Sequence, residues 1–179
     1  IDLHTSGLYA SWAGAHFYAD ASMRWMDFDA RLMSIGGEQR TSGNATAFNL
    51  EAGYTGWNLG AFTVTPQVQY TRAMVDDIAP VSGSLVDFAA YGGESERVRL
   101  GVGLGRSFTS GGGVLWTPYG AISAVDELAG DSSYVVDGNG QFSGRNSTDG
   151  THALLEAGLG VQFGGLSVTG GLNWSDGGA

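Results

Sequence analysis

Apolar and polar residues alternate along most of this chain. In residues 17–25 the odd positions are apolar, from Phe17 to Trp25, while the even positions include Asp20 and Arg24. A period of two places successive side chains on opposite faces of a β-strand, so the segment predicts a strand with one apolar and one polar face. The same alternation recurs in residues 8–12, 46–54, 62–74, 98–104, 153–163 and 166–174. With a less regular segment at 114–128, the pattern predicts an all-β chain of about eight antiparallel strands.

The connections between the predicted strands are alternately short and long. Short turns fall at 14–16, 56–60, 110–113 and 164–165. Long connections, which we predict to be loops, fall at 34–44, 77–95 and 129–150. Short turns on one rim and long loops on the other are typical of outer-membrane barrels. The pattern therefore favours an antiparallel transmembrane β-barrel.

The polar faces of the strands fit the water-filled lumen of such a barrel. They consist of Gly, Ser, Thr, Asn and Gln, together with six charged residues that we predict to face the lumen: Asp20, Arg24, Glu51, Arg97, Arg99 and Glu156. The opposite face is almost free of charge. This fits contact with lipid, because an arginine at the bilayer midplane costs about 2–4 kcal/mol. Arg72 is the exception on that face, and its place near a strand end predicts a side chain that snorkels toward water.

Large aromatic residues lie near the ends of the predicted strands. Four of them lie within a few residues of short turns: Trp12, Tyr54, Trp57 and Trp116. Tyr70 and Trp174 lie toward the opposite ends of their strands. Amphipathic rings are favoured at membrane interfaces, so we predict that these six residues form the aromatic girdle of the barrel.

Composition excludes several other classes of protein. The formal net charge of -10 argues against a nucleic-acid partner, because a phosphate-binding surface needs a basic patch. The absence of cysteine excludes a disulfide framework and a thiolate metal site. The 31 glycines disfavour helices, since each costs about 1 kcal/mol relative to alanine. The three histidines lack metal-ligand spacing and no nucleophile-elbow motif occurs, so we expect no enzyme activity, no metal and no cofactor.

Several motifs resemble the translocator domain of autotransporters, the proteins of type V secretion. "GLYASWAGAHFYADASMRWMDFDARL" looks like one hairpin of that family, and "FNLEAGYTGWNLGAFTVTPQVQYTRAMVDD" is similar to the next. "ERVRLGVGLGRSF", "WTPYGAISAVDEL" and "LEAGLGVQFGGLSVTGGLNWS" continue the resemblance in the family's order. The order of the motifs is more specific than any one of them.

The resemblance implies a carboxy-terminal, twelve-stranded barrel in the outer membrane of a Gram-negative bacterium. Such a barrel contacts outer-membrane lipid and helps to export a passenger that precedes it, with the help of the barrel-assembly machinery. A linker helix from the passenger then occupies the lumen. We therefore expect residues 1–179 to form a single domain, incomplete at both ends, that comprises about eight central strands of the barrel.

Alternative readings remain open from the sequence. The lumenal charges either hold the linker helix and tune ion passage, or pair with one another and keep the lumen wet and rigid; we favour mutual pairing. The barrel as a whole could instead be a general porin or an adhesin-like barrel. A soluble β-sandwich or ligand-binding barrel is a further alternative, in which the apolar face is a core.

Overall fold

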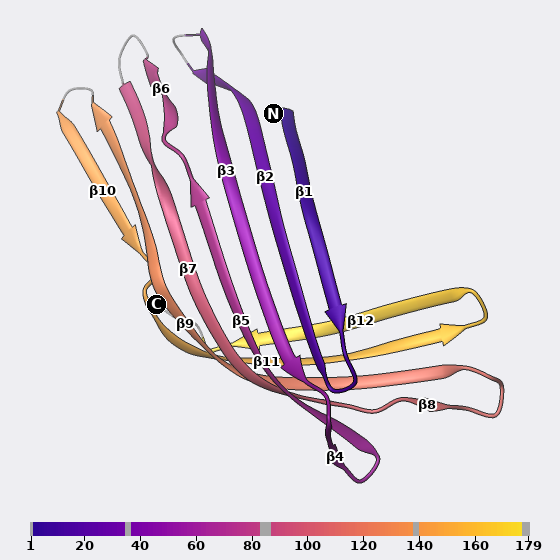
Figure 1. The fold of residues 1–179 in the computed structure, drawn as a ribbon. Coiled ribbons are helices and arrows are strands. Elements are labelled where there is room, and N and C mark those ends of the chain that lie inside the picture. Colours follow the sequence, from indigo (N-terminus) through magenta and orange to yellow (C-terminus); the bar gives the residue numbers. More distant parts are fainter. Residues whose placement is uncertain (1, 35–36, 83–86, 138–139, 177–179) are drawn as a thin grey trace.

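The computed structural model of the chain describes residues 2–34, 37–82, 87–137 and 140–176. Figure 1 shows a single antiparallel sheet without helices in these residues. Its strands are β1 (Asp2–Ala13), β2 (Phe17–Ser34), β3 (Gly37–Tyr54), β4 (Trp57–Leu59), β5 (Phe62–Val75), β6 (Ile78–Ser82), β7 (Asp87–Gly105), β8 (Phe108–Thr109), β9 (Leu115–Asp137), β10 (Gln141–Ser147), β11 (Gly150–Phe163) and β12 (Leu166–Ser175). Among the described residues we find no helical segment with the length and hydropathy that a bilayer crossing requires.

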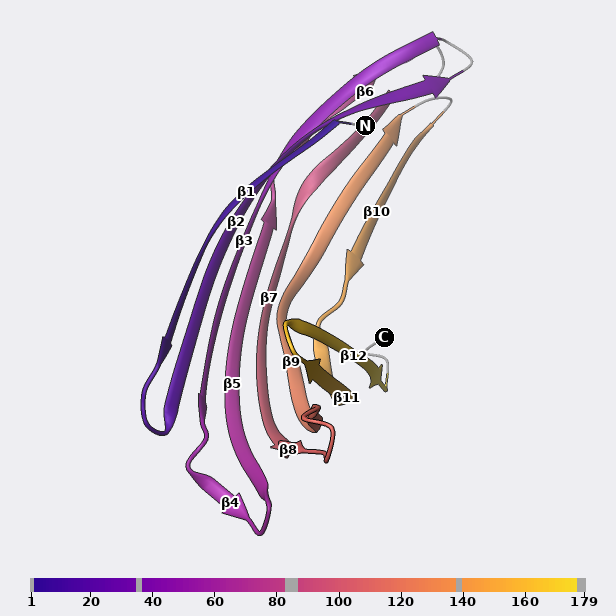
Figure 2. The same ribbon diagram turned by 90° about the vertical axis from the view of Figure 1, so that its right-hand side faces the viewer.

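The long strands pair in chain order. The path through the sheet is β1-β2-β3-β5-β7-β9-β11-β12, and the short strands β4, β6, β8 and β10 extend the pairing at the ends of β5, β7 and β9. Figure 2 shows that the sheet curls into an open trough with β1 and β12 as its two edges. The prediction of an all-β antiparallel fold with about eight main strands is confirmed.

The prediction that the long connections are loops is wrong for most of their described residues. β3 begins at Gly37, β7 begins at Asp87, and β9 continues to Asp137 and pairs with β10. These segments are rich in Ser, Gly and Asp, which favour turns in isolation. Here they extend hairpins whose backbone pairing already exists in the apolar part of each strand, and this pairing outweighs local preference.

The sheet has almost no core of its own. Val125, with 2% of its surface exposed, is the one buried apolar residue in the described part of the chain. Large apolar side chains instead cover the convex face, where Leu172 is 84% exposed. A β-sandwich would bury such a face against a second sheet, and no second sheet covers this one in the described ranges. The convex face therefore requires an apolar environment outside the protein.

Aromatic rings on the concave face lie against glycines of the neighbouring strand. Four such pairs recur along the sheet: Tyr18 with Gly53, Phe28 with Gly43, Tyr119 with Gly158, and Tyr134 with Gly144. A Cβ atom at Gly43 would lie 2.6 Å from the Cζ atom of Phe28, so the ring occupies the space that a side chain would need. The glycines let the rings lie flat on the inner wall of a strongly curved sheet, which keeps the trough open.

Candidate functional site

The centre of the concave face is organised by Arg99 on β7. Its Nη1 atom donates to Glu156 Oε2 on β11 at 2.9 Å, and its Nη2 atom lies 3.9 Å from Glu51 Oε2 on β3. Only 15% of the Arg99 side chain is exposed. To reach β11 it crosses β9, where Val125 and Ser123 are buried at 2% and 3% exposure. One guanidinium therefore ties together strands that are not neighbours in the sheet.

Polar side chains from two more strands complete this cluster. Gln69 lies between Glu51 and Arg99 in the strand register, and its Nε2 atom donates to Glu51 Oε2 at 3.2 Å. The Tyr18 hydroxyl on β2 donates to Glu51 Oε1 at 2.8 Å. We call Tyr18, Glu51, Gln69, Arg99 and Glu156 the lumenal cluster. It connects β2, β3, β5, β7 and β11, which holds the curvature of the wall through hydrogen bonds to charged groups.

The other predicted lumenal charges do not join the lumenal cluster. Asp20 accepts a hydrogen bond from the Tyr9 hydroxyl at 2.6 Å, close to the edge strand β1. The register places Arg24 and Arg97 on the same concave face, but neither forms an ion pair with any described residue. Glu127, which faces Arg97 in the register, instead accepts a hydrogen bond from Ser95 at 2.5 Å. The six predicted residues therefore share a face but divide into separate groups.

Sequence reasoning missed four members of these groups, three of them neutral. All four lie on the polar face of their strands: Tyr9, Tyr18, Gln69 and Glu127. The alternation of faces along each strand could therefore have identified them. The sequence candidates were the charged residues of the regularly alternating strands, which leaves out the neutral partners and also Glu127 in the less regular segment at 114–128. The hydrogen bonds of the two tyrosines to Asp20 and Glu51 show that they are part of the polar wall.

Two polar atoms of the lumen wall are buried without a partner in the described residues. These are Arg99 Nε and Ser123 Oγ, which lie on adjacent strands β7 and β9. A buried donor or acceptor without a hydrogen bond is costly, and such atoms in protein interiors are commonly satisfied by ordered water. In the described part of the chain no group of three or more His, Asp or Glu side chains has an arrangement that could hold a metal ion.

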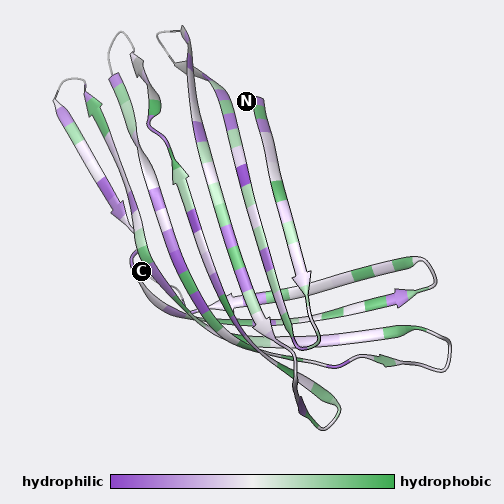
Figure 3. Ribbon diagram, in the orientation of Figure 1, coloured by the Kyte–Doolittle hydropathy of each residue, from purple (hydrophilic) through white to green (hydrophobic). Residues whose placement is uncertain are grey.

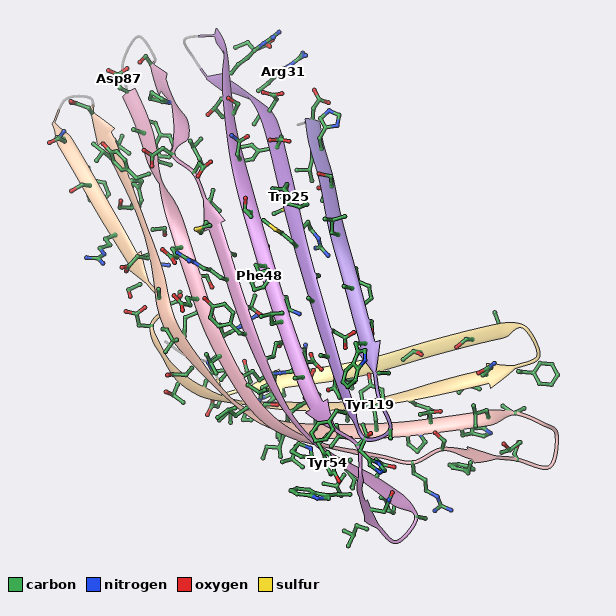
Figure 4. The ribbon with its side chains drawn as sticks, in the orientation of Figure 1. Trp25, Arg31, Phe48, Tyr54, Asp87 and Tyr119 are labelled. Carbon is green, nitrogen blue, oxygen red and sulfur yellow. The ribbon has the colours of Figure 1, made fainter. Side chains whose placement is uncertain are left out.

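The convex face carries aromatic residues at the rim with the short turns. Tyr54 packs against Phe17 with ring centroids 4.8 Å apart, and against Trp57 at 5.8 Å. Trp12 is exposed beside the first turn, and Trp116 lies beside the turn between β8 and β9. Figure 4 shows Tyr54 at this rim. The four residues predicted at this end all lie close to short turns in the structure.

A second belt lies further along the strands. Tyr70 on β5 faces the convex side, and its hydroxyl donates to Glu96 at 3.0 Å. Trp174 lies at the end of β12 away from its short turn. Figure 4 shows Trp25 on β2 and Phe48 on β3, and the register pairs Phe48 with Met23, two residues before Trp25. Neither residue was included in the predicted girdle. Trp25 was missed because it lies in the middle of a strand that continues well beyond the apolar segment.

Arg72 marks the end of the apolar part of the convex face. Its Nη2 atom lies 2.7 Å from Glu94 Oε1 on β7. The guanidinium therefore pairs with a neighbouring strand, where the sequence predicted only a side chain snorkelling to water. A matched ion pair next to Tyr70 and Glu96 is suited to the boundary between lipid and water.

Comparison with known protein families agrees with this geometry. Residues 1–173 match the family model described as the autotransporter beta-domain. The chain belongs to this family. No curated protein matches the sequence. The autotransporter β-domain is a transmembrane β-barrel in the outer membrane of Gram-negative bacteria, with a translocator role in type V secretion and a passenger domain on the same chain. The predicted family, fold class and location are therefore confirmed.

The length of the apolar segments fits this location. On β2 the convex side chains are apolar from Phe17 to Trp25, and Asp27, Asp29 and Arg31 follow on the same side. That span is about nine residues, the length that a tilted transmembrane strand requires. On β5 the apolar segment of the autotransporter β-domain likewise runs from Phe62 to Tyr70 and is followed by Arg72. The outer halves of these strands therefore project beyond the membrane.

Proposed function

We propose that this autotransporter β-domain exports the passenger that precedes it and then anchors and displays it at the cell surface. The observation that carries the proposal is Arg99, which pairs with Glu51 and Glu156 on the concave wall of a sheet whose convex face is apolar. A polypeptide cannot cross lipid with unpaired backbone groups, and a polar lumen inside an apolar shell supplies them with water and partners.

We further propose that the lumen holds the linker helix of the same polypeptide after export. The lumenal cluster supports this, because its polar side chains come from five strands and line the concave wall, where polar side chains of a helix could form hydrogen bonds with them. The mutual pairing of Arg99 with Glu51 and Glu156 keeps the wall in place before the linker arrives.

Insertion of the barrel is proposed to require the barrel-assembly machinery. The sheet has two open edges, β1 and β12, among its described strands, and an open edge in lipid leaves backbone groups without partners. An assembly factor that covers the two edges until the barrel closes would avoid the free-energy cost of these unpaired backbone groups. We also propose that the domain acts without catalysis, since its polar groups are arranged as a wall and pair with one another.

The full-length parent protein in a Gram-negative host tests these proposals. We expect the outer-membrane fraction to contain a band whose gel mobility shifts on boiling, and added protease to release the passenger from intact cells. Depletion of the assembly machinery is expected to abolish both signals. An inserted barrel with a passenger retained in the periplasm would contradict export and favour a general porin. A protein that stays soluble without detergent would contradict the barrel itself.

A further inference from the structure

Arg106 lies at the rim with the short turns and has no carboxylate partner among the described residues. It directly follows β7, and its backbone N–H donates to the Pro118 carbonyl on β9 at 3.1 Å. The residue is exposed, and none of the ion pairs in the described part of the chain involves it. The sheet therefore holds its backbone in place, while its guanidinium is free to bind an anion.

Two phenylalanine rings flank the Arg106 guanidinium. Its Cζ atom lies 5.8 Å from the centre of the Phe62 ring and 5.5 Å from the centre of the Phe108 ring. Both distances are within the range of a cation–π interaction, which orients the guanidinium and partly shields it from water. The rings belong to β5 and β8, and Figure 3 shows hydrophobic residues in β8 and at the turn-side end of β5. We call Phe62, Arg106 and Phe108 the rim site.

The rim site lies at one end of the membrane-spanning part of β7. The convex side chains of this strand are apolar from Val98 to Leu104, with Glu96 before them and Arg106 after them. A transmembrane strand needs about 9–11 residues, and the segment from Glu96 to Arg106 has about that length. The two charged residues therefore lie at opposite surfaces of the bilayer.

The aromatic residues at this rim give the depth of the rim site in the membrane. The register aligns Trp57, Val64 and Leu104 in one row across β4, β5 and β7. Arg106 lies two residues beyond Leu104 toward the turns, which is about 7 Å along the strand. Tryptophan rings are favoured at the level of the lipid headgroups. The Arg106 guanidinium is therefore placed at the level of the headgroup phosphates.

Arg72, at the opposite membrane surface, has a counter-charge within the protein. Its Nη2 atom lies 2.7 Å from Glu94 Oε1 on the adjacent strand β7. Arg106 instead has two aromatic rings as its side-chain neighbours. A cation at a membrane surface attracts anionic lipid headgroups, and this attraction is available to Arg106 because no carboxylate of the described residues neutralises it.

We propose that the rim site binds the phosphate of a phospholipid headgroup in the periplasmic leaflet, next to the short turns. The Arg106 guanidinium presents a planar fork of N–H donors that matches a phosphate bidentately. Phe62 and Phe108 are 39% and 43% exposed and contact the hydrocarbon of the same lipid. A phospholipid supplies both an anion and hydrocarbon, whereas free phosphate supplies only the anion. The proposal rests on the outer-membrane location of the domain and is independent of passenger export.

Native mass spectrometry of the full-length protein in a neutral detergent tests the proposal. Dioleoyl phosphatidylglycerol is the probe; dioleoylglycerol is the lipid without phosphate, and glycerol 3-phosphate is the phosphate without acyl chains. Phosphatidylglycerol is expected to bind more tightly than either. We expect Arg106→Gln to weaken the binding of the first phosphatidylglycerol by roughly tenfold, because it removes charge-assisted hydrogen bonds. Arg106→Lys is expected to lose less, since it keeps the charge without the planar fork.

Arg40→Gln is the matched control, because it removes one arginine charge from an exposed position on β3 in the outer half. Its affinity for phosphatidylglycerol is expected to equal that of the unchanged protein. An unchanged affinity in Arg106→Gln, or an equal loss in Arg40→Gln, would overturn the proposal.

The three probes on the unchanged protein test the source of the phosphate and need no variant. Glycerol 3-phosphate that binds as tightly as phosphatidylglycerol would show a site for free phosphate, and dioleoylglycerol that does so would show a purely apolar site. Either result would overturn the proposal. The gel mobility of each variant before and after boiling verifies that its barrel is folded, and passenger exposure on intact cells reports separately on export.

Discussion

The inner and outer halves of this sheet are built from the same strands but have opposite polarity. In the inner half the convex face is apolar and the concave face carries the lumenal cluster around Arg99. In the outer half the convex face carries Asp27, Glu94 and Asp131, and the concave face is apolar. The strand backbone itself does not favour an apolar convex face or an apolar concave face. The surroundings of each face, lipid or water, determine which side chains are found there. The comparison locates the outer boundary of the membrane at the point of reversal.

The test with the largest expected effect on stability places an arginine on the convex face of each half. Leu100→Arg on β7 faces lipid and is expected to lower the free energy of unfolding by about 2–4 kcal/mol, because the arginine lies in hydrocarbon. Ser42→Arg on β3 faces water in the outer half, opposite Asp29, and is expected to change it by less than about 0.5 kcal/mol. The urea midpoint of the heat-modifiable band measures both. Equal effects would contradict the proposed boundary.

A second test concerns the polar wall of the inner half. Arg99→Met leaves Glu51 and Glu156 without their shared cation and is expected to cost about 2 kcal/mol, which is below the figure for a fully buried pair because lumenal water reaches the carboxylates. Arg24→Met is the matched control, since Arg24 has no ion pair with the described residues. Replacing both glutamates by glutamine in the Arg99→Met background is expected to recover most of the loss. An equal cost for Arg24→Met would argue against a special role for Arg99.

A third test uses a feature that both halves share. Phe28 lies on Gly43 in the outer half and Tyr18 lies on Gly53 in the inner half. Gly43→Val and Gly53→Val are each expected to cost about 1–2 kcal/mol, because the new side chain displaces a ring. Gly111→Ala lies in a turn with open space around it and should be neutral. Thermal loss of the heat-modifiable band measures the three variants; a neutral Gly43→Val would show that the ring moves freely.

The smallest expected effect concerns an ion pair on the convex side of the outer half. Arg145 on β10 donates to Asp131 on β9 at 2.5 Å, which lowers the pKa of Asp131 below its usual range. The carboxylate therefore contributes stability that is present above the ordinary aspartate pKa of about 3.9 and is lost as the pH falls below it. Limited proteolysis of the β9–β10 hairpin should accelerate slightly in that acid range. Arg145→Gln should remove this pH dependence, and an unchanged profile in that variant would contradict the assignment.

The alternation of side chains within single strands predicted which residues of the site share a face. The sequence placed Asp20, Arg24, Glu51, Arg97, Arg99 and Glu156 on polar faces, and the structure finds them on the concave wall. It did not show which of them meet, because contact depends on the register between strands. Arg99 reaches Glu51 past Gln69 and reaches Glu156 across β9, while Arg24 and Arg97 remain apart from the cluster.

The amino-acid sequence by itself determined the antiparallel β class, the number of main strands and the apolar face of each membrane segment, since these depend only on a period of two and on short turns. The tertiary structure alone decided where the strands end and where their polarity reverses. Pairing with a neighbour extends β3, β7 and β9 through residues that favour turns in isolation, and the extra residue between Tyr91 and Glu94 turns Phe88 inward. Register and bulges are relations between strands, so no pattern within one strand contains them.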